Sequence, residues 1–240
     1  MSVLIMETII RKSIERGHAN HGWLNSHHTF SFADYHDPAQ MGFRSLRVIN
    51  EDYVAPGGGF PTHPHRDMEI FSYVVEGTLE HKDSMGNGRQ LKPGQIQLMS
   101  AGSGVTHSEF NPSSSEPAHF LQIWIKPRHQ GLAPSYTEWH PSPANDGAAK
   151  VLVISPDGRD GSAIIHQDVD VWRVRLKAGE TVSHEVTASR GLWFQLITGK
   201  VSANGNPLDA GDAASTASTG RFEISATEDA EALLFDLAAV

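Results

Sequence analysis

The chain has 240 residues and no cysteine. This absence excludes disulfide bonds, thiolate metal sites and cysteine nucleophiles, so any metal must be held by histidine, aspartate or glutamate. A cysteine-free chain also fits a reducing compartment. The first residues, Met1 to Glu7, lack the basic start and long apolar stretch of a signal peptide. No run approaches the roughly 18 apolar residues that span a bilayer. We therefore expect a cytoplasmic protein with no membrane partner.

Basic residues are also few. The chain has 19 Lys and Arg against 28 Asp and Glu, which gives a formal net charge of −9. Direct nucleic-acid binding needs a basic surface and is therefore not expected, whereas a protein partner is permitted. Hydrophobic residues make up 39% of the chain and charged residues 20%, a balance typical of a chain with a packed core.

Long helical patterns are nearly absent. Short β-rich runs at 70–75, 120–125 and 193–197 stand between turn clusters such as 83–88 and 204–207. Many short strands separated by turns are typical of an antiparallel sandwich or barrel. The sequence therefore predicts an all-β protein with few, short helices.

A weak internal repeat indicates two copies of one barrel. Each copy reads as strand, glycine, strand, turn, strand and a second glycine turn, and each ends in an apolar strand. Between the copies lies a proline-rich run, which is a poor central strand because proline cannot donate to a ladder. We predict an N-terminal barrel over 1–135, a linker over 136–150 and a C-terminal barrel over 151–240.

Histidines are distributed unevenly between the copies. Twelve of the fourteen fall at or before His140, and only His166 and His184 follow. His184 stands near the place that His63 holds in the first copy, but two residues later Val186 replaces His65. We therefore expect a metal site in the first barrel and none in the second.

Two short segments carry the candidate ligands, Thr62-His63-Pro64-His65 and Thr106-His107-Ser108-Glu109. In an extended strand, residues i and i+2 point to the same face. Two such strands facing each other would bring three imidazoles and a carboxylate together, a ligand set for one divalent transition metal with positions left open. Glu69, four residues after His65, satisfies the same alternation.

Other polar residues in this half are more ambiguous. Gln122 lies inside an apolar strand, so it could face the barrel interior near the site or be a buried structural glutamine. A single histidine is more often a satisfied polar residue than a ligand. Structural roles are therefore favoured for six histidines, although they could line a pocket: His18, His21, His27, His28, His36 and His81.

The two motifs resemble those of the cupin superfamily. Gly57, His63, His65 and Glu69 match the first cupin motif, and Gly104, His107 and Asn111 match the second. The resemblance narrows to the pirin family over roughly residues 11 to 127, through the segments 16–18, 21–24, 28–32, 46–50, 59–60, 63–69, 81–87 and 100–109. The C-terminal half matches more weakly, through His166-Gln167-Asp168.

The resemblance implies a bicupin, two tandem jelly-roll-like cupin barrels with the metal in the N-terminal one. In most cupins the glutamate of the first motif is a ligand, which makes Glu69 the alternative fourth ligand. The closer resemblance to pirins makes Glu109 the expected fourth ligand beside His63, His65 and His107, and leaves Glu69 a supporting or structural role. One metal per chain is expected. Iron is the expected ion, with manganese, nickel, cobalt, copper and zinc as alternatives.

The resemblance also implies an activity, that of a quercetin 2,3-dioxygenase. Such an enzyme uses dioxygen to open the heterocyclic ring of a flavonol and releases carbon monoxide, and Glu109 would accept the proton of the flavonol 3-hydroxyl. Pirins are also described as metal-dependent, redox-sensing regulators that act through protein partners. A non-catalytic regulator is therefore the alternative hypothesis.

Overall fold

The computed structural model describes residues 6–239, and this part of the chain is almost entirely β-structure. Its helices are two 3₁₀ turns, η1 (Ser13–Glu15) and η2 (Arg159–Gly161). Neither of these two turns in residues 6–239 is long and apolar enough to cross a membrane. The predicted all-β class with few, short helices is confirmed.

The N-terminal half forms a seven-stranded sheet and a four-stranded sheet, both antiparallel. In spatial order the larger sheet contains β12 (Ser135–Trp139), β9 (Ile96–Ser100), β6 (Glu69–Glu76), β11 (Ala118–Ile125), β4 (Leu46–Val54), β3 (Leu24–His28) and β2 (Gly17–Asn20). The smaller sheet contains β5 (Gly59–His65), β10 (Val105–Phe110), β7 (Leu79–Asp83) and β8 (Gly88–Leu91).

The C-terminal half repeats this arrangement, except that its edge strand β14 (Ala163–Ile164) runs parallel to β13 (Lys150–Ser155). Its larger sheet contains β1 (Ile9–Arg11), β20 (Ala213–Thr216), β17 (Arg190–Thr198), β22 (Ala230–Ala238), β15 (Val169–Leu176), β13 and β14. Its smaller sheet contains β16 (Thr181–Val186), β21 (Gly220–Ala226), β18 (Lys200–Ala203) and β19 (Asn206–Asp209). The equivalent strands follow one another in the same order, as the internal repeat predicted.

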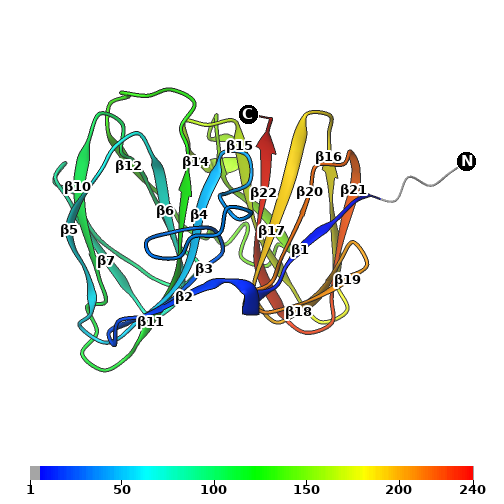
Figure 1. Cartoon of the computed structure of the whole chain (residues 1–240), viewed down its shortest axis with the longest axis horizontal. Helices are drawn as coiled ribbons and strands as arrows, with labels where there is room; N and C mark the ends of the chain where they lie inside the picture. Colours follow the sequence, from blue (N-terminus) through cyan, green and yellow to red (C-terminus); the bar gives the residue numbers. More distant parts are fainter. Residues whose placement is uncertain (1–5, 240) are drawn as a thin grey trace, which may run out of the picture.

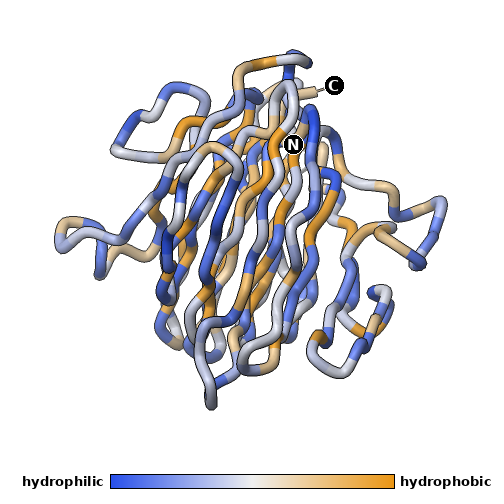
Figure 2. Tube along the Cα trace, turned by 90° about the vertical axis from the view of Figure 1, so that its left-hand side faces the viewer, coloured by the Kyte–Doolittle hydropathy of each residue, from blue (hydrophilic) through white to orange (hydrophobic). Residues whose placement is uncertain are grey.

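The two barrels stand side by side, and their larger sheets meet in the middle of the molecule (Figure 1). One buried apolar cluster joins them, with Phe71 and Leu121 from the first barrel and Val171 and Phe235 from the second. Hydrophilic and hydrophobic residues alternate along the strands in Figure 2, as expected for sheets that bury each face differently. The outer faces of the larger sheets thus hold the barrels together, and the inner faces are left to line each barrel.

Two edge strands lie far from where the sequence would place them. The N-terminal strand β1 pairs with β20 of the second half, and β12, most of which lies in the expected linker 136–150, pairs with β9 of the first half. Pro134 and Pro141 flank β12, which stands at the edge of its sheet, where proline is tolerated. Residues 9–11 therefore extend the second sheet, and residues 135–139 extend the first.

Candidate metal centre

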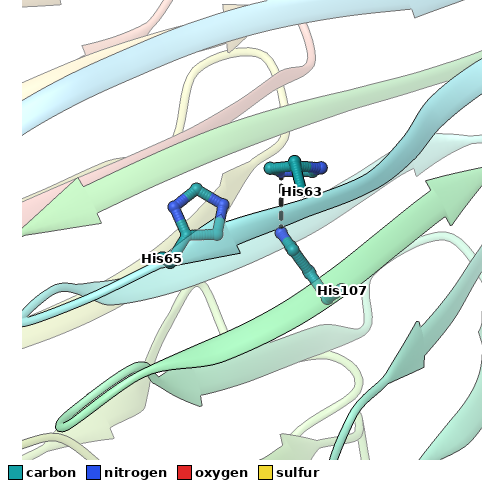
Figure 3. A group of neighbouring side chains, drawn as sticks. All are labelled: His63, His65 and His107. Atoms are coloured by element: carbon teal, nitrogen blue, oxygen red, sulfur yellow. Dashed lines mark hydrogen bonds between the residues drawn. The ribbon is translucent and has the colours of Figure 1, made fainter.

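Strands β5 and β10 pair so that the two ligand segments face the same point. His63 lies directly opposite His107, and His65 lies opposite Val105. One nitrogen from each of His63, His65 and His107 falls within 4.8 Å of the others. Figure 3 shows the three rings converging between the two strands. The i, i+2 spacing in the sequence therefore does place these imidazoles together.

The orientation of the rings suits a cation. His63 Nδ1 lies 2.8 Å from the carbonyl oxygen of Pro61 and must donate a proton to it, so its Nε2 carries a lone pair. That Nε2 faces His107 Nε2 at 3.1 Å (Figure 3). Two lone pairs at this separation repel unless a proton or a metal ion lies between them. The nitrogen donor set fits a divalent transition metal.

The environment keeps the imidazoles of His65 and His107 neutral, the form that binds metal. Burial, reinforced by the neighbouring imidazoles of His107 and His63, lowers the pKa of His65 to about 4. Burial and the nearby His63 and His81 lower the pKa of His107 to about 3. At neutral pH the rings therefore offer lone pairs without first losing a proton.

Glu109 follows on the same strand, after an irregularity in the register between β10 and β5. One oxygen of its carboxylate lies within 4.8 Å of ring nitrogens of His107 and His81, so Glu109 forms a second group with these two residues and is not part of the group of His63, His65 and His107. Oε1 accepts hydrogen bonds from Ser72 Oγ at 2.8 Å and Gln97 Nε2 at 2.6 Å, and Oε2 accepts one from Gln122 Nε2 at 2.5 Å. Burial raises the pKa of Glu109, and the hydrogen bond from Ser72 opposes this rise.

The donors around Glu109 belong to one polar row across the larger sheet. Five neighbouring strands each contribute a buried polar residue at the same level, and each residue is the cross-strand partner of the next: His28, Asn50, Gln122, Ser72 and Gln97. His28 Nδ1 and Asn50 Oδ1 are 2.8 Å apart. Gln122 therefore lies in the barrel interior beside Glu109. This position corresponds to the first of the two roles considered for it from the sequence, a residue that faces the interior near the site.

Glu69 lies elsewhere. The chain turns at Asp67, which has a positive φ of 49°, and Glu69 begins the next strand, β6. The alternation counted from His65 therefore does not carry through to it. Its Oε1 accepts a hydrogen bond from Ser100 Oγ at 2.6 Å, and its Oε2 accepts one from the backbone N–H of His166 at 3.2 Å. Glu69 thus ties the first barrel to the second.

His81 and Asp83 lie behind the histidine cluster; the sequence favoured a structural role for His81 and gave no role to Asp83. Both side chains are fully buried, and His81 Nε2 lies 3.1 Å from Asp83 Oδ2. Burial alone would raise the pKa of Asp83, but hydrogen bonds from Asn87 and His81 hold it below its usual value. The signal was present: His81-Lys82-Asp83 has the same i, i+2 spacing as the ligand pairs.

A cavity of about 790 Å³ opens beside the metal centre, and His63, His65 and Gln122 lie in its wall. Its volume falls within the range usual for small-molecule sites. Its other walls include four aromatic side chains, Trp23, Phe32, Phe60 and Trp124. Asp52 also borders it, accepting a hydrogen bond from Ser26 Oγ at 2.5 Å, and burial raises the pKa of Asp52 to about 7.

The equivalent place in the second barrel has different chemistry. His184 pairs opposite Phe222, as His63 pairs opposite His107. Both nitrogens of His184 are engaged, Nε2 with Asp236 Oδ2 and Nδ1 with Lys150 Nζ, each at 2.7 Å. The interior that holds polar groups in the first barrel is filled here by apolar side chains, among them Val186, Phe194, Ala214, Phe222, Ile224 and Leu234.

Comparison with known proteins gives matches along both halves. The pirin family model matches residues 10–125, and a quercetinase C-terminal cupin domain model matches residues 152–237. A quercetin 2,3-dioxygenase of Escherichia coli (strain K12) is 51% identical over 228 residues, which cover 95% of this chain and 97% of that protein. A pirin-like protein of Caulobacter vibrioides is 42% identical over 96% of this chain and 100% of that one.

A solved structure gives the same result. The bacterial pirin YhhW of Escherichia coli, in complex with nickel(II), superposes with a TM-score of 0.93 at 49% identity, over 98% of this chain and 100% of that chain. These similarities extend over nearly the whole chain, and they confirm both the expected resemblance and the tandem cupin fold. The chain belongs to the pirin family.

Proposed function

We propose that this protein is a metal-dependent dioxygenase that opens the heterocyclic ring of a quercetin-type flavonol and releases carbon monoxide. The observation that carries the proposal is the position of His63 and His65 in the wall of a cavity of about 790 Å³. A metal held there would be accessible to a small molecule inside the barrel. The similarity to the quercetin 2,3-dioxygenase of Escherichia coli supports this reading.

In this proposal His63, His65 and His107, together with Glu109, hold one divalent metal per chain. Iron remains the expected ion, and the nickel(II) complex of the relative YhhW makes nickel a strong alternative. A bound metal would supply Lewis acidity, which favours loss of the proton from a flavonol 3-hydroxyl. The apolar filling of the second barrel supports a single site.

Glu109 is the proposed proton acceptor, either as one of the residues that would hold the metal or from a position beside it. Because burial raises its pKa, its carboxylate is a better base than an exposed one. Three hydrogen-bond donors, on Ser72, Gln97 and Gln122, fix its orientation. The carboxylate would take the 3-hydroxyl proton and return it to the ring-opened product.

The cavity suits the shape of a flavonol. Trp23, Phe32, Phe60 and Trp124 would pack against a flat aromatic body and exclude water from it. Asp52, whose Oδ1 accepts from Ser26, could accept a hydrogen bond from a ring hydroxyl. The substrates of this proposal are therefore a hydroxylated, planar aromatic molecule and dioxygen.

The test is to measure oxygen consumption and carbon monoxide release from quercetin by the metal-loaded protein. We expect both in the wild type and neither in His65→Ala. His129→Ala is the matched control, because His129 is exposed and lies outside the site, and it should retain full activity. Metal binding without flavonol turnover in the wild type would refute the proposal and favour the regulatory alternative.

A further inference from the structure

A chain of three side chains runs from a buried carboxylate to the histidine cluster. Asp83 Oδ2 lies 3.1 Å from His81 Nε2, and His81 Nδ1 lies 3.4 Å from His107 Nδ1. The opposite nitrogen of His107, Nε2, faces His63. Strand β7 carries the first two residues and pairs with β10, which carries His107. Both His81 and Asp83 have fully buried side chains, so water does not interrupt the chain.

The direction of each hydrogen bond in a metal-bound form follows from the two ends of the chain. The carboxylate of Asp83 already accepts hydrogen bonds from three donors: Met85 N and Asn87 N on Oδ1, and Asn87 Nδ2 on Oδ2. A carboxylate held by these donors only accepts, so His81 presents Nε2–H to it. If His107 binds a metal through Nε2, its own proton lies on Nδ1, and His81 Nδ1 is the atom placed to accept it.

We propose that Asp83 and His81 are positioning residues that favour metal binding by His107, because His81 Nδ1, held in place by Asp83, accepts the Nδ1–H of the metal-bound ring. Histidine ligands commonly donate their second N–H to a partner, which fixes the ring and its tautomer. Here that partner is a second imidazole, itself fixed by a carboxylate. The inference rests on the proposed metal site but not on the proposed flavonol chemistry.

The substitution Asp83→Asn tests this direction with a change of one atom. The two backbone donors on Oδ1 hold the amide oxygen in that place, so the new amino group faces His81 and the side-chain amide of Asn87, which must turn over to present its oxygen. His81 Nε2 must then accept and its Nδ1–H must donate, so His107 Nδ1 must accept and the ring can no longer offer a lone pair from Nε2. We expect the affinity for nickel(II) to fall by about 10- to 100-fold, the usual loss for such partners.

His81→Asn provides the matched comparison. Its amide oxygen can take the place of Nδ1 and accept from His107 without reference to residue 83. We therefore expect nearly wild-type nickel affinity from His81→Asn, and no further loss when Asp83→Asn is added to it. His81→Phe fills the same space without an acceptor and should lose affinity as Asp83→Asn does. Asp157→Asn, which changes an exposed carboxylate in the other barrel, is the control for the substitution itself.

Competition with a chelator measures the nickel(II) affinity of each variant. Equal affinities for His81→Asn and His81→Phe, or wild-type affinity in a folded Asp83→Asn, would overturn the inference. The first of these comparisons holds even if Asp83→Asn fails to fold. A wild type that binds no nickel would instead refute the metal site.

Discussion

Replacing Gln122 with leucine tests the part that the polar row plays at Glu109. Gln122 Nε2 donates to Glu109 Oε2 at 2.5 Å, and both groups are buried. Leucine should be accommodated, because Leu234 of the second barrel pairs with β17 and β15 as Gln122 pairs with β6 and β4. The substitution therefore removes a hydrogen bond to a buried carboxylate without removing the core around it.

The size of the effect follows from that hydrogen bond. A hydrogen bond to a charged group contributes about 1.5–3 kcal/mol, and one pKa unit corresponds to about 1.4 kcal/mol. The donor stabilises the ionised form, so its loss should raise the pKa of Glu109 further above its usual value, beyond the rise that burial already causes. The ionised carboxylate would then form only at higher pH. We expect the acidic limb of the kcat/KM profile to move to higher pH.

The assay is oxygen consumption with quercetin across the acid and neutral range, for the wild type and Gln122→Leu. Gln167→Leu is the control, because Gln167 bonds the backbone of Lys126 at the surface between the barrels. An acidic limb that stays in place, or that moves to lower pH, would refute the reasoning even if the maximal rate fell. A shift with Gln167→Leu would show that the effect is not specific to Glu109.

Three further predictions concern stability and stoichiometry. His119 and Arg16 overcome the effect of burial and hold the pKa of Glu51 at about 2 instead of 4.5. Because the folded pKa is depressed, this stabilisation is present above pH 4.5 and is lost as pH falls toward 2. Glu51→Gln should therefore lower the free energy of unfolding in urea by about 3 kcal/mol at neutral pH and remove this acid dependence. An unchanged urea midpoint would contradict this prediction. His63→Ala should abolish nickel binding, whereas His184→Ala should keep one nickel per chain by elemental analysis; a wild type with two would argue against a single site. A Cβ on Gly59 would lie 2.4 Å from the carbonyl oxygen of Glu109. Gly59→Ala should therefore lower the free energy of unfolding by about 1–3 kcal/mol and weaken nickel binding. Calorimetry that shows neither loss would contradict the β5–β10 geometry.

Strand alternation predicted the converging histidines because it depends only on local geometry. His63 and His65 share a face of β5, and His107 faces them from β10, as the i, i+2 spacing requires. The same rule misled for Glu69, because the chain turns at Asp67 and starts a new strand before reaching it. Alternation holds within a strand and carries no information across a turn.

The polar row and the chain behind His107 could not be predicted from spacing. His28 and Gln97 are far apart in the sequence, and they share a row only because the strand order brings β3 and β9 into one sheet. His81 resembled an ordinary histidine beside a turn, since its role depends on the pairing of β7 with β10. Long-range register, rather than residue type, determines these partners.

The positions of the edge strands β1 and β12 could not be predicted from the sequence either. β1 is three residues long, and its partner β20 lies about two hundred residues away in the chain. β12 stands between prolines and reads as a linker, yet it completes the first sheet. Short edge strands depend on the shape of the sheet that they join, so their own residues indicate little.

The most direct test of the central claim is a crystal structure of the nickel-loaded protein with anomalous scattering measured at the nickel edge. We predict one peak per chain, bound by the Nε2 atoms of His63 and His107 and by a nitrogen of His65 at about 2.0–2.2 Å. We expect Glu109 to complete the protein ligands, and no peak near His184. A metal bound elsewhere, or a loaded protein with no peak between β5 and β10, would contradict the account.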